Sequence, residues 1–280
     1  MELTDLQKKI LLYLQKGLNI KEFPFKDLLT KINISATELI IEIKALLDDN
    51  IIRDISAILQ AKQIGFHSAL IAITVDEQYI EKVAKCINAH NGVSHNYLRD
   101  HTFNIWFTLT IPQEESFETV LSQFQSQCLI ENYHVFHNEE EFKIKMVLPF
   151  DKDGNMDGSI QTENKNITSK ELFYQPLSSK EIECLKLLQK QMPLSITPFL
   201  DLYDSNKLSI SFDEFLKTAN DLLDRKIIKR YSAVLRHRKA GYTSNAMTAW
   251  KTGGSETFNA DIEQFRQNPH VSHLYRRTIK

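Results

Sequence analysis

The chain has 280 residues, of which 42% are hydrophobic and 25% are charged, and its formal net charge is -2. This length suits about two domains with buried cores, and the slightly negative charge excludes a general polyanion binder, so any basic site must be local. No segment is long and apolar enough to span a bilayer, and the alternating apolar and charged residues at the N-terminus are unlike a signal peptide.

The spacing of the cysteines indicates which kinds of site and which cellular compartment to expect. Cys86, Cys128 and Cys184 are far apart in the sequence and form no CxxC pair. This spacing indicates neither a zinc site nor a disulfide framework. We therefore expect a cytoplasmic protein that does not associate with a membrane.

An internal duplication runs through most of the chain. IRDISAILQAKQIGF at 52–66 reappears as IKRYSAVLRHRKAGY at 228–242, and VSHNYLRDH at 93–101 recurs as VSHLYRRTI at 271–279. The repetition predicts two copies of one architecture on one polypeptide.

Each copy opens with two segments typical of helices that begin at a capping box, which is Ser or Thr followed three residues later by Glu or Gln. Between these helices, PFKDLLTKI and ITPFLDLYD predict a short third helix. The three helices predict a winged helix-turn-helix at residues 1–62 and again at 177–238, with the following hairpin as the wing. The capping pairs are Thr4 with Gln7, Ser35 with Glu38, Ser178 with Glu181, and Ser211 with Glu214.

Residues 63–150 predict a ferredoxin-like domain. HSALIAITV, VSHNYLRDH, FNIWFTLTI and FKIKMVLPF are typical of strands, and DEQYIEKVAKCINAH and SFETVLSQFQSQ are typical of amphipathic helices. The resulting order βαββαβ places both helices on one face of an antiparallel sheet. We expect Phe103, Trp106 and Phe107 to belong to the core of this sheet.

The second copy repeats this domain only in part. A polar segment rich in turn formers, residues 151–176, links the copies, and residues 239–280 then supply two strands and one helix. The missing strands would leave an edge and an apolar face uncovered, so either a partner chain covers them or the chain is a shorter version of a longer protein. The predicted fold class is α+β, a tandem repeat of winged helix-turn-helix plus ferredoxin-like domain, with the second copy incomplete at its C-terminus.

One predicted strand carries a functional group at every second residue, and an extended strand would direct all of them to one face. A buried strand would normally carry aliphatic side chains there, so the pattern indicates a site. The four residues are His95, Tyr97, Arg99 and His101, and three of them recur in the second copy as His273, Tyr275 and Arg277, beside Arg276.

The second wing is basic where the first is not. Arg236 and Arg238 alternate with His237, so a strand would direct both guanidinium groups to one face, a geometry suited to binding carboxylates bidentately. Lys239 follows directly. The alternative interpretation is a solvated basic hairpin without a ligand.

The second main helix of each copy bears on DNA binding. Residues 36–49 carry four acidic side chains against one lysine, and residues 212–225 carry four acidic side chains against two basic ones. Because such helices repel a phosphate backbone, we expect them to serve as a packing scaffold.

A winged helix-turn-helix joined to a ferredoxin-like domain resembles the Lrp/AsnC regulators of amino-acid metabolism. GVSHNYLRDHTFNIWFTL at 92–109 and RYSAVLRHRKAGYTSNAMTAW at 230–250 are similar to the signatures of the two subunits of sirohaem decarboxylases, which act in alternative haem and haem d1 biosynthesis. The resemblance implies loss of carbon dioxide from the C12 and C18 acetates of sirohaem, giving 12,18-didecarboxysirohaem. The alternative is an Lrp/AsnC-type regulator that binds DNA and a small-molecule or haem effector.

The same resemblance implies how the site would work. The protein would have no cofactor or metal of its own, because the iron belongs to the sirohaem substrate. A histidine or tyrosine would deliver a proton as general acid, or a histidine would instead bind the sirohaem iron. We expect His101 and His237 as the catalytic pair, then His95 and Tyr97. Arginine and lysine suit the substrate carboxylates. The expected substrate-binding residues are Arg99, Arg236, Arg238, Lys239, His273, Tyr275, Arg276 and Arg277.

The expected partners follow from these assignments. They are sirohaem or a related iron tetrapyrrole, without DNA or a membrane. The two internal repeats should pair as a pseudo-dimer, and a homodimer is the alternative assembly.

Overall fold

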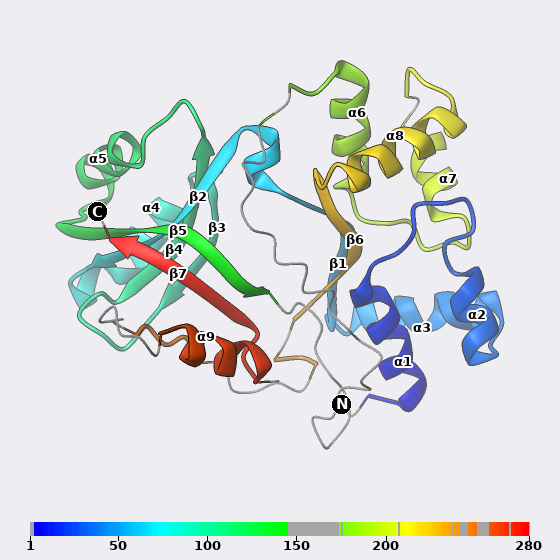
Figure 1. The fold of residues 1–280 in the computed structure, drawn as a ribbon, viewed down its shortest axis with the longest axis horizontal. Coiled ribbons are helices and arrows are strands. Elements are labelled where there is room, and N and C mark those ends of the chain that lie inside the picture. The colour runs from blue at the N-terminus through cyan, green and yellow to red at the C-terminus, as the bar shows by residue number, and fades with distance from the viewer. Residues whose placement is uncertain are drawn as a thin grey trace. The chain divides into compact units, whose positions relative to one another are not determined.

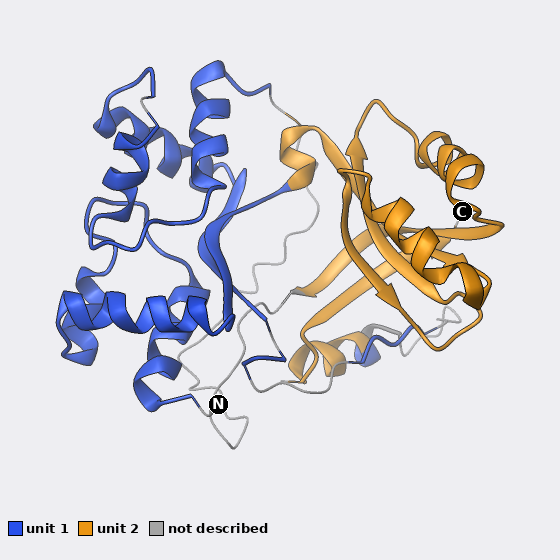
Figure 2. Ribbon diagram, turned by 180° about the vertical axis from the view of Figure 1, so that it is seen from behind, with its two compact units in different colours: residues 1–60, 145–165, 176–261 blue, residues 61–144, 166–175, 262–280 orange. Residues whose placement is uncertain are grey.

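The computed structural model describes residues 3–144, 174, 176–206, 208–236, 238–240, 246–250, 258–268 and 270–279. These residues form two compact units (Figures 1 and 2). The described parts of 1–60 and 176–261 belong to unit 1, and those of 61–144, 166–175 and 262–280 belong to unit 2. Each unit therefore draws on both copies of the repeat. The domain boundaries expected at residues 62, 150, 176 and 238 stay predictions.

Unit 1 contains the three helices expected for each copy. The side chains of Thr4, Ser35, Ser178 and Ser211 each accept a hydrogen bond from the backbone N–H three residues later, which confirms the predicted helix starts. In the first copy the helices are α1 Asp5–Lys16, α2 Lys26–Ile32 and α3 Ala36–Asp48. In the second copy they are α6 Ser179–Leu188, α7 Pro198–Asp204 and α8 Phe212–Asp224.

The strands that follow these helices pair with each other. β1 Ile52–Leu59 and β6 Ile228–Leu235 form a two-stranded antiparallel sheet centred on the pair Ser56 and Ser232, which occupy equivalent positions of the two copies. Such pairing is isologous, as in a symmetric dimer. The expectation of a local hairpin as the wing is therefore wrong for both described strands, because each finds its partner in the other copy.

Unit 2 is built on a five-stranded sheet with the order β3-β4-β2-β5-β7. Its first four strands in the chain have the order and helix placement of a ferredoxin-type sheet, as predicted. They are β2 Phe66–Thr74, β3 Val93–Leu98, β4 Ile105–Pro112 and β5 Asn132–Ile144, with the 3-10 segments Ala61–Ile64 and Glu77–Tyr79 and the helices α4 Ile80–Asn88 and α5 Phe117–Cys128. β7 His273–Ile279 completes the sheet, and α9 Phe258–Gln267 is divided, with residues 258–261 in unit 1 and 262–267 in unit 2.

Two expectations for this sheet are corrected. The last strand of the first copy, expected at 142–150, is β5 and ends at Ile144; residues 145–150 lie outside the described part of the chain. The strand expected to belong to a separate second sandwich, β7, instead pairs antiparallel with β5 (Figure 1). Arg276 lies opposite Glu140 and 3.5 Å from Glu139, and Arg277 lies opposite Asn138 and donates a hydrogen bond to the Phe136 carbonyl.

One face of the sheet packs against α4 and α5. Ile71 of β2 and Phe107 of β4 are fully buried, and they belong to one hydrophobic cluster with Val83 and Ile87 of α4 and Leu121 of α5. The alternation of buried and half-buried residues along β4 produces this arrangement. The core assignment of Phe107 is therefore confirmed. Among the described residues, no helix has the length and apolarity needed to cross a membrane.

The cysteines depart from expectation. Cys86 of α4 and Cys128 of α5 are joined by a disulfide with a Cα–Cα distance of 5.7 Å. The sequence did not indicate this proximity, because the two cysteines are 42 residues apart. They meet because the two helices lie side by side on the sheet. Cys184 of α6 is buried as a free thiol.

The buried thiol should make the protein less stable in alkali. Burial, and secondarily the charge of Glu181, raises the pKa of Cys184 from 9.0 to about 12. The thiol ionises at a lower pH in the unfolded chain than in the folded one. The stability that the protonated thiol contributes is therefore complete below pH 9 and is lost as the pH rises toward 12. By pH 10 the loss should be roughly 1.4 kcal/mol. Urea unfolding at pH 8 and pH 10 should show this slope in the native chain and a reduced slope in Cys184→Ala; equal slopes would contradict the assignment.

Candidate functional site

The face of the five-stranded sheet opposite α4 and α5 is rich in aromatic and ionisable side chains. Because Phe107 points toward the helices, its neighbour Trp106 points the other way, and so do the residues paired with it. We call this surface the aromatic face. It is formed by His95 and Tyr97 of β3, Trp106 of β4, His134 and Phe136 of β5, and His273, Tyr275 and Arg277 of β7.

Aromatic rings cross the middle of this face in contact with one another. Trp106 stacks on Phe136 with ring centroids 5.2 Å apart, and His134 lies between Phe136 and Phe103, 4.6 Å from the latter. The indole N–H of Trp106 donates to the carbonyl of Phe103 at 2.6 Å, which fixes the ring. The sequence reasoning placed Trp106 in the core, and that is wrong, since its position one residue from Phe107 puts it on the opposite face.

β3 supplies the first predicted set of residues. His95 and Tyr97 lie in phase on the aromatic face, with ring centroids 6.2 Å apart. The strand ends at Leu98, so Arg99 lies just beyond it and places its guanidinium 4.7 Å from the centroid of the Tyr97 ring. A cation over a tyrosine ring at this distance is an attractive contact.

His101 does not continue the strand, contrary to expectation. It lies in the loop between β3 and β4, which is closed by a hydrogen bond from the Arg99 N–H to the Asn104 carbonyl. The Asn104 side chain ties the loop to the end of β2 by accepting from the Val75 N–H and donating to its carbonyl. His101 stacks on Phe103, whose N–H donates to His101 Nδ1 at 3.1 Å.

β7 supplies the second predicted set, at the other edge of the sheet. His273 and Tyr275 have ring centroids 6.1 Å apart, and the Arg277 guanidinium lies 4.8 Å from the centroid of the Tyr275 ring. Burial, reinforced by the charge of Glu141, raises the pKa of Tyr275 to about 12, so this phenol keeps its proton at neutral pH. Arg276 points to the opposite face, where it lies 3.5 Å from Glu139.

The predicted basic residues of the second copy lie in unit 1. β6 ends at Leu235, and the Arg236 carbonyl then accepts hydrogen bonds from the N–H groups of Lys239 and Ala240, so the segment is a turn. The expectation that Arg236 and Arg238 alternate on one strand face is therefore wrong. Arg236, Arg238 and Lys239 are exposed. His237 lies outside the described residues.

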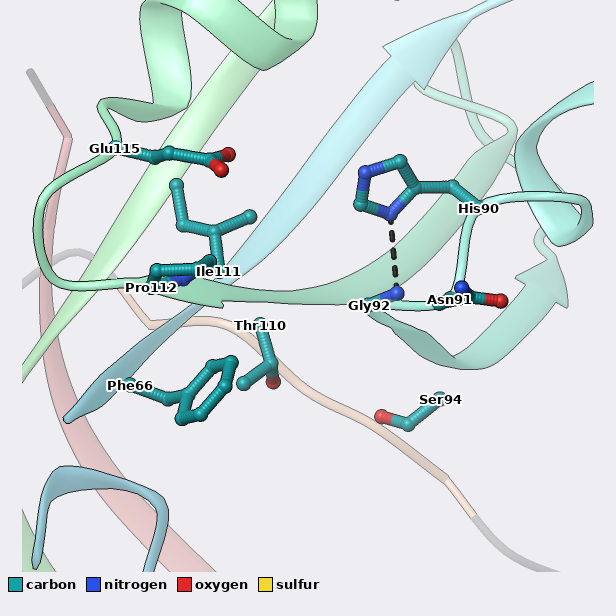
Figure 3. Close-up of a pocket in the computed structure, with 9 residues that line it drawn as sticks. All are labelled: Phe66, His90, Asn91, Gly92, Ser94, Thr110, Ile111, Pro112 and Glu115. Carbon is teal, nitrogen blue, oxygen red and sulfur yellow. Dashed lines mark hydrogen bonds between the residues drawn. The ribbon is translucent and has the colours of Figure 1, made fainter. Parts of the chain in front are cut away.

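A shallow pocket of about 350 Å³ lies at the start of β3, where Ser94, the residue before His95, is one of its lining residues (Figure 3). It is formed where β2 begins and β4 ends, between Phe66, Pro112 and the turn that carries His90. His90 Nδ1 accepts a hydrogen bond from the Gly92 N–H at 3.0 Å, which shapes this turn. None of the predicted catalytic or substrate-binding side chains lines the pocket.

Comparison with known proteins places the fold and then the family. Residues 63–143 match the AsnC-like ligand binding domain. The chain is 36% identical over 273 residues to a siroheme decarboxylase from Hydrogenobacter thermophilus, covering 96% of this chain and 78% of that protein. It is 31% identical over 152 residues to a siroheme decarboxylase alpha subunit from Oleidesulfovibrio alaskensis, covering 54% of this chain and 92% of the relative.

A solved structure supports the same relationship. The crystal structure of the siroheme decarboxylase NirDL superposes with a TM-score of 0.62 at 31% identity, covering 82% of this chain and 65% of that one. A second NirDL structure, in complex with an iron-uroporphyrin III analogue, gives a TM-score of 0.61 at the same identity, covering 82% of this chain and 66% of that one. The architecture is thus that of a mixed α/β protein with an AsnC-like ferredoxin-type sheet. The chain belongs to the siroheme decarboxylase family, whose members are carboxy-lyases.

Proposed function

We propose that this chain removes the carboxylates of the C12 and C18 acetate side chains of sirohaem, giving 12,18-didecarboxysirohaem. The observation that carries the proposal is the aromatic face, which combines stacked rings with His, Tyr and Arg at both edges, in a chain 36% identical to a siroheme decarboxylase. The iron belongs to the substrate, and the chain supplies no cofactor of its own.

The aromatic face suits a flat, polyanionic macrocycle. The rings of Trp106 and Phe136 offer a conjugated surface for stacking. Arg99 and Arg277, one at each edge of the sheet, are proposed to bind the peripheral carboxylates, because their planar guanidinium groups match carboxylate geometry. The exposed residues Arg236, Arg238, Lys239 and His273 remain proposed substrate-binding residues. Arg276 does not, because it points away from the aromatic face toward Glu139.

Decarboxylation requires no external redox partner. The bond between the acetate methylene and its carboxylate breaks, carbon dioxide leaves, and the pyrrole ring takes the electron pair until a proton reaches the methylene carbon. The protein must therefore orient one carboxylate, neutralise the others and donate a proton. General acid catalysis of this kind contributes roughly 10²–10⁴-fold to a rate.

The hydrogen bond at His101 fixes which ring nitrogen accepts and which carries the proton in the neutral ring. Because Nδ1 of His101 accepts from the Phe103 N–H, the neutral ring carries its proton on Nε2. A metal-bound histidine has the reverse arrangement, in which the second ring nitrogen donates its N–H to a neighbour. We therefore do not propose His101 as a ligand of the iron, and we keep it as a proposed catalytic residue together with His95, Tyr97 and His237.

The remaining assignments are proposals of the same kind. The chain is proposed to act in the cytoplasm as a pseudo-dimer of its internal repeats, with a homodimer as the alternative. DNA is not a proposed partner, because α3 and α8 are acidic. Lys44 of α3 is itself paired with Asp48.

Mass spectrometry of the porphyrin after anaerobic incubation with sirohaem tests the proposal. We expect two losses of carbon dioxide with the native chain, and a turnover lower by roughly 10²–10⁴-fold in His101→Ala with a similar affinity measured from the Soret band. His270→Ala, which removes an exposed histidine, is the matched control. An unchanged porphyrin mass, together with salt-sensitive binding of specific DNA, would establish the regulator instead.

A further inference from the structure

The two edges of the five-stranded sheet carry the same module in nearly the same geometry. In β3 the His95 and Tyr97 rings are 6.2 Å apart with an angle of 30° between their planes, and in β7 the His273 and Tyr275 rings are 6.1 Å apart at 29°. The arginine that follows each tyrosine lies over its ring, at 4.7 Å in the first module and 4.8 Å in the second.

The residue before each histidine completes the repetition. Ser94 Oγ lies 3.1 Å from His95 Nδ1, and Ser272 Oγ lies 3.0 Å from His273 Nδ1. We call these two sets the β3 module (Ser94, His95, Tyr97, Arg99) and the β7 module (Ser272, His273, Tyr275, Arg277). The ring, cation and hydroxyl contacts therefore recur at both edges of the sheet.

Both modules serve one surface from opposite ends. The histidines, tyrosines and β7 arginine point to the aromatic face, and the Arg99 guanidinium reaches the same side over Tyr97. Three strands separate β3 from β7, so the modules are four strand spacings apart, on the order of 19 Å. This is the separation of the strand backbones, and we expect each tyrosine to reach a different carbon atom of one bound macrocycle.

The proposed substrate loses two carboxylates of the same chemical kind, and the sheet offers two acid modules of the same kind. We propose that each module carries out one of the two decarboxylations, with Tyr97 and Tyr275 as the respective proton donors. This inference rests on the proposed sirohaem decarboxylase activity. In each step the carbon–carbon bond to the carboxylate breaks, carbon dioxide leaves, and the electron pair passes through the pyrrole ring to take the tyrosine proton. Water then reprotonates the phenolate.

Differences between the modules should direct each of them to a different acetate of the substrate. Tyr97 is 46% exposed, whereas Tyr275 is half-buried beside Glu141. The two tyrosines therefore differ in exposure and in the charge beside them, so each module should act on one position of the macrocycle.

Single hydroxyl deletions test the division of labour. Tyr97→Phe and Tyr275→Phe keep the ring contacts and remove only the proton donor. Each should slow one decarboxylation by roughly 10²–10⁴-fold and accumulate a mono-decarboxylated product. The two products should differ in which acetate survives, as read by tandem mass spectrometry and NMR, and the double variant should accumulate neither. Tyr79→Phe, which alters an exposed tyrosine away from the aromatic face, should yield the doubly decarboxylated product like the native chain.

The outcomes separate this inference from the proposed function. If both single variants lose both decarboxylations equally, yield the same mono-decarboxylated product, or behave like the native chain, the division between modules is wrong and the activity still stands. If the native chain itself releases no carbon dioxide from sirohaem, the proposed function is wrong.

Discussion

Replacing Gly92 by alanine should destabilise unit 2 by about 2–4 kcal/mol, which is the sum of overpacking and a weakened hydrogen bond. A Cβ at this position would lie 2.1 Å from the carbonyl oxygen of Thr110. That oxygen belongs to the backbone of β4, which cannot move independently, because the Thr110 N–H donates to the Gly92 carbonyl at 2.9 Å. The substitution therefore pushes β3 and β4 apart where they begin to pair.

Urea unfolding measures this loss directly. Asn91→Ala is the matched control, because Asn91 is the exposed preceding residue of the same turn, and its stability should stay within about 0.5 kcal/mol of the native chain. The Gly92→Ala variant should also disturb the His90 turn that borders the pocket in Figure 3. A Gly92→Ala protein with the native unfolding midpoint would show that this close approach does not exist.

Removing the stacked rings of the aromatic face should weaken sirohaem binding strongly. Trp106→Leu and Phe136→Leu keep apolar side chains but remove the conjugated surfaces. Stacking on an aromatic side chain is worth about 1–3 kcal/mol per ring in other ligand classes, so each variant should raise the Kd about 10-fold and the double variant about 100-fold. Soret titrations under anaerobic conditions measure the change.

The control for this prediction is a leucine substitution elsewhere. Phe23→Leu alters a ring that is 48% exposed in unit 1, and its Kd for sirohaem should match that of the native chain. Folded Trp106→Leu and Phe136→Leu proteins that bind as tightly as the native chain would place the macrocycle somewhere other than the aromatic face.

Local patterns in the sequence predicted the local structure well. The capping boxes located the helix starts at Thr4 and Ser178 because the cap is formed by residues three positions apart. The alternation in β3 likewise located His95 and Tyr97 on one face. Both features depend only on the period of a helix or strand, which a single segment contains in full.

Contacts between strands or cysteines that are distant in the chain were not predictable from local patterns. β5 was misplaced because the run of acidic residues from Glu139 looks unsuited to a strand, and its partner β7, with Arg276 opposite Glu140, lies far away in the sequence. The disulfide between Cys86 and Cys128 depends on two helices meeting on one sheet. Such pairings are properties of the assembled fold rather than of any one segment.

The residues of the candidate site likewise divide into those that a sequence pattern revealed and those that it did not. His273, Tyr275 and Arg277 were found because they repeat the first-copy pattern. Trp106 was missed because an aromatic residue in a strand is assigned to the core by default, and Phe136 belongs to the strand whose position was wrong. The strand containing His101 was expected to extend past Leu98, but the Asn104 side chain holds a loop there instead.

Each copy of the repeat contributes a strand to a pairing with the other copy in both units. In unit 1, β1 of the first copy pairs with β6 of the second. In unit 2, β5 of the first copy pairs with β7 of the second. If the halves were separate polypeptides, each would expose unpaired strand edges in both units until it met its counterpart. Joining them in one chain turns a concentration-dependent encounter into an intramolecular one, so the order of both sheets no longer depends on how much protein is present.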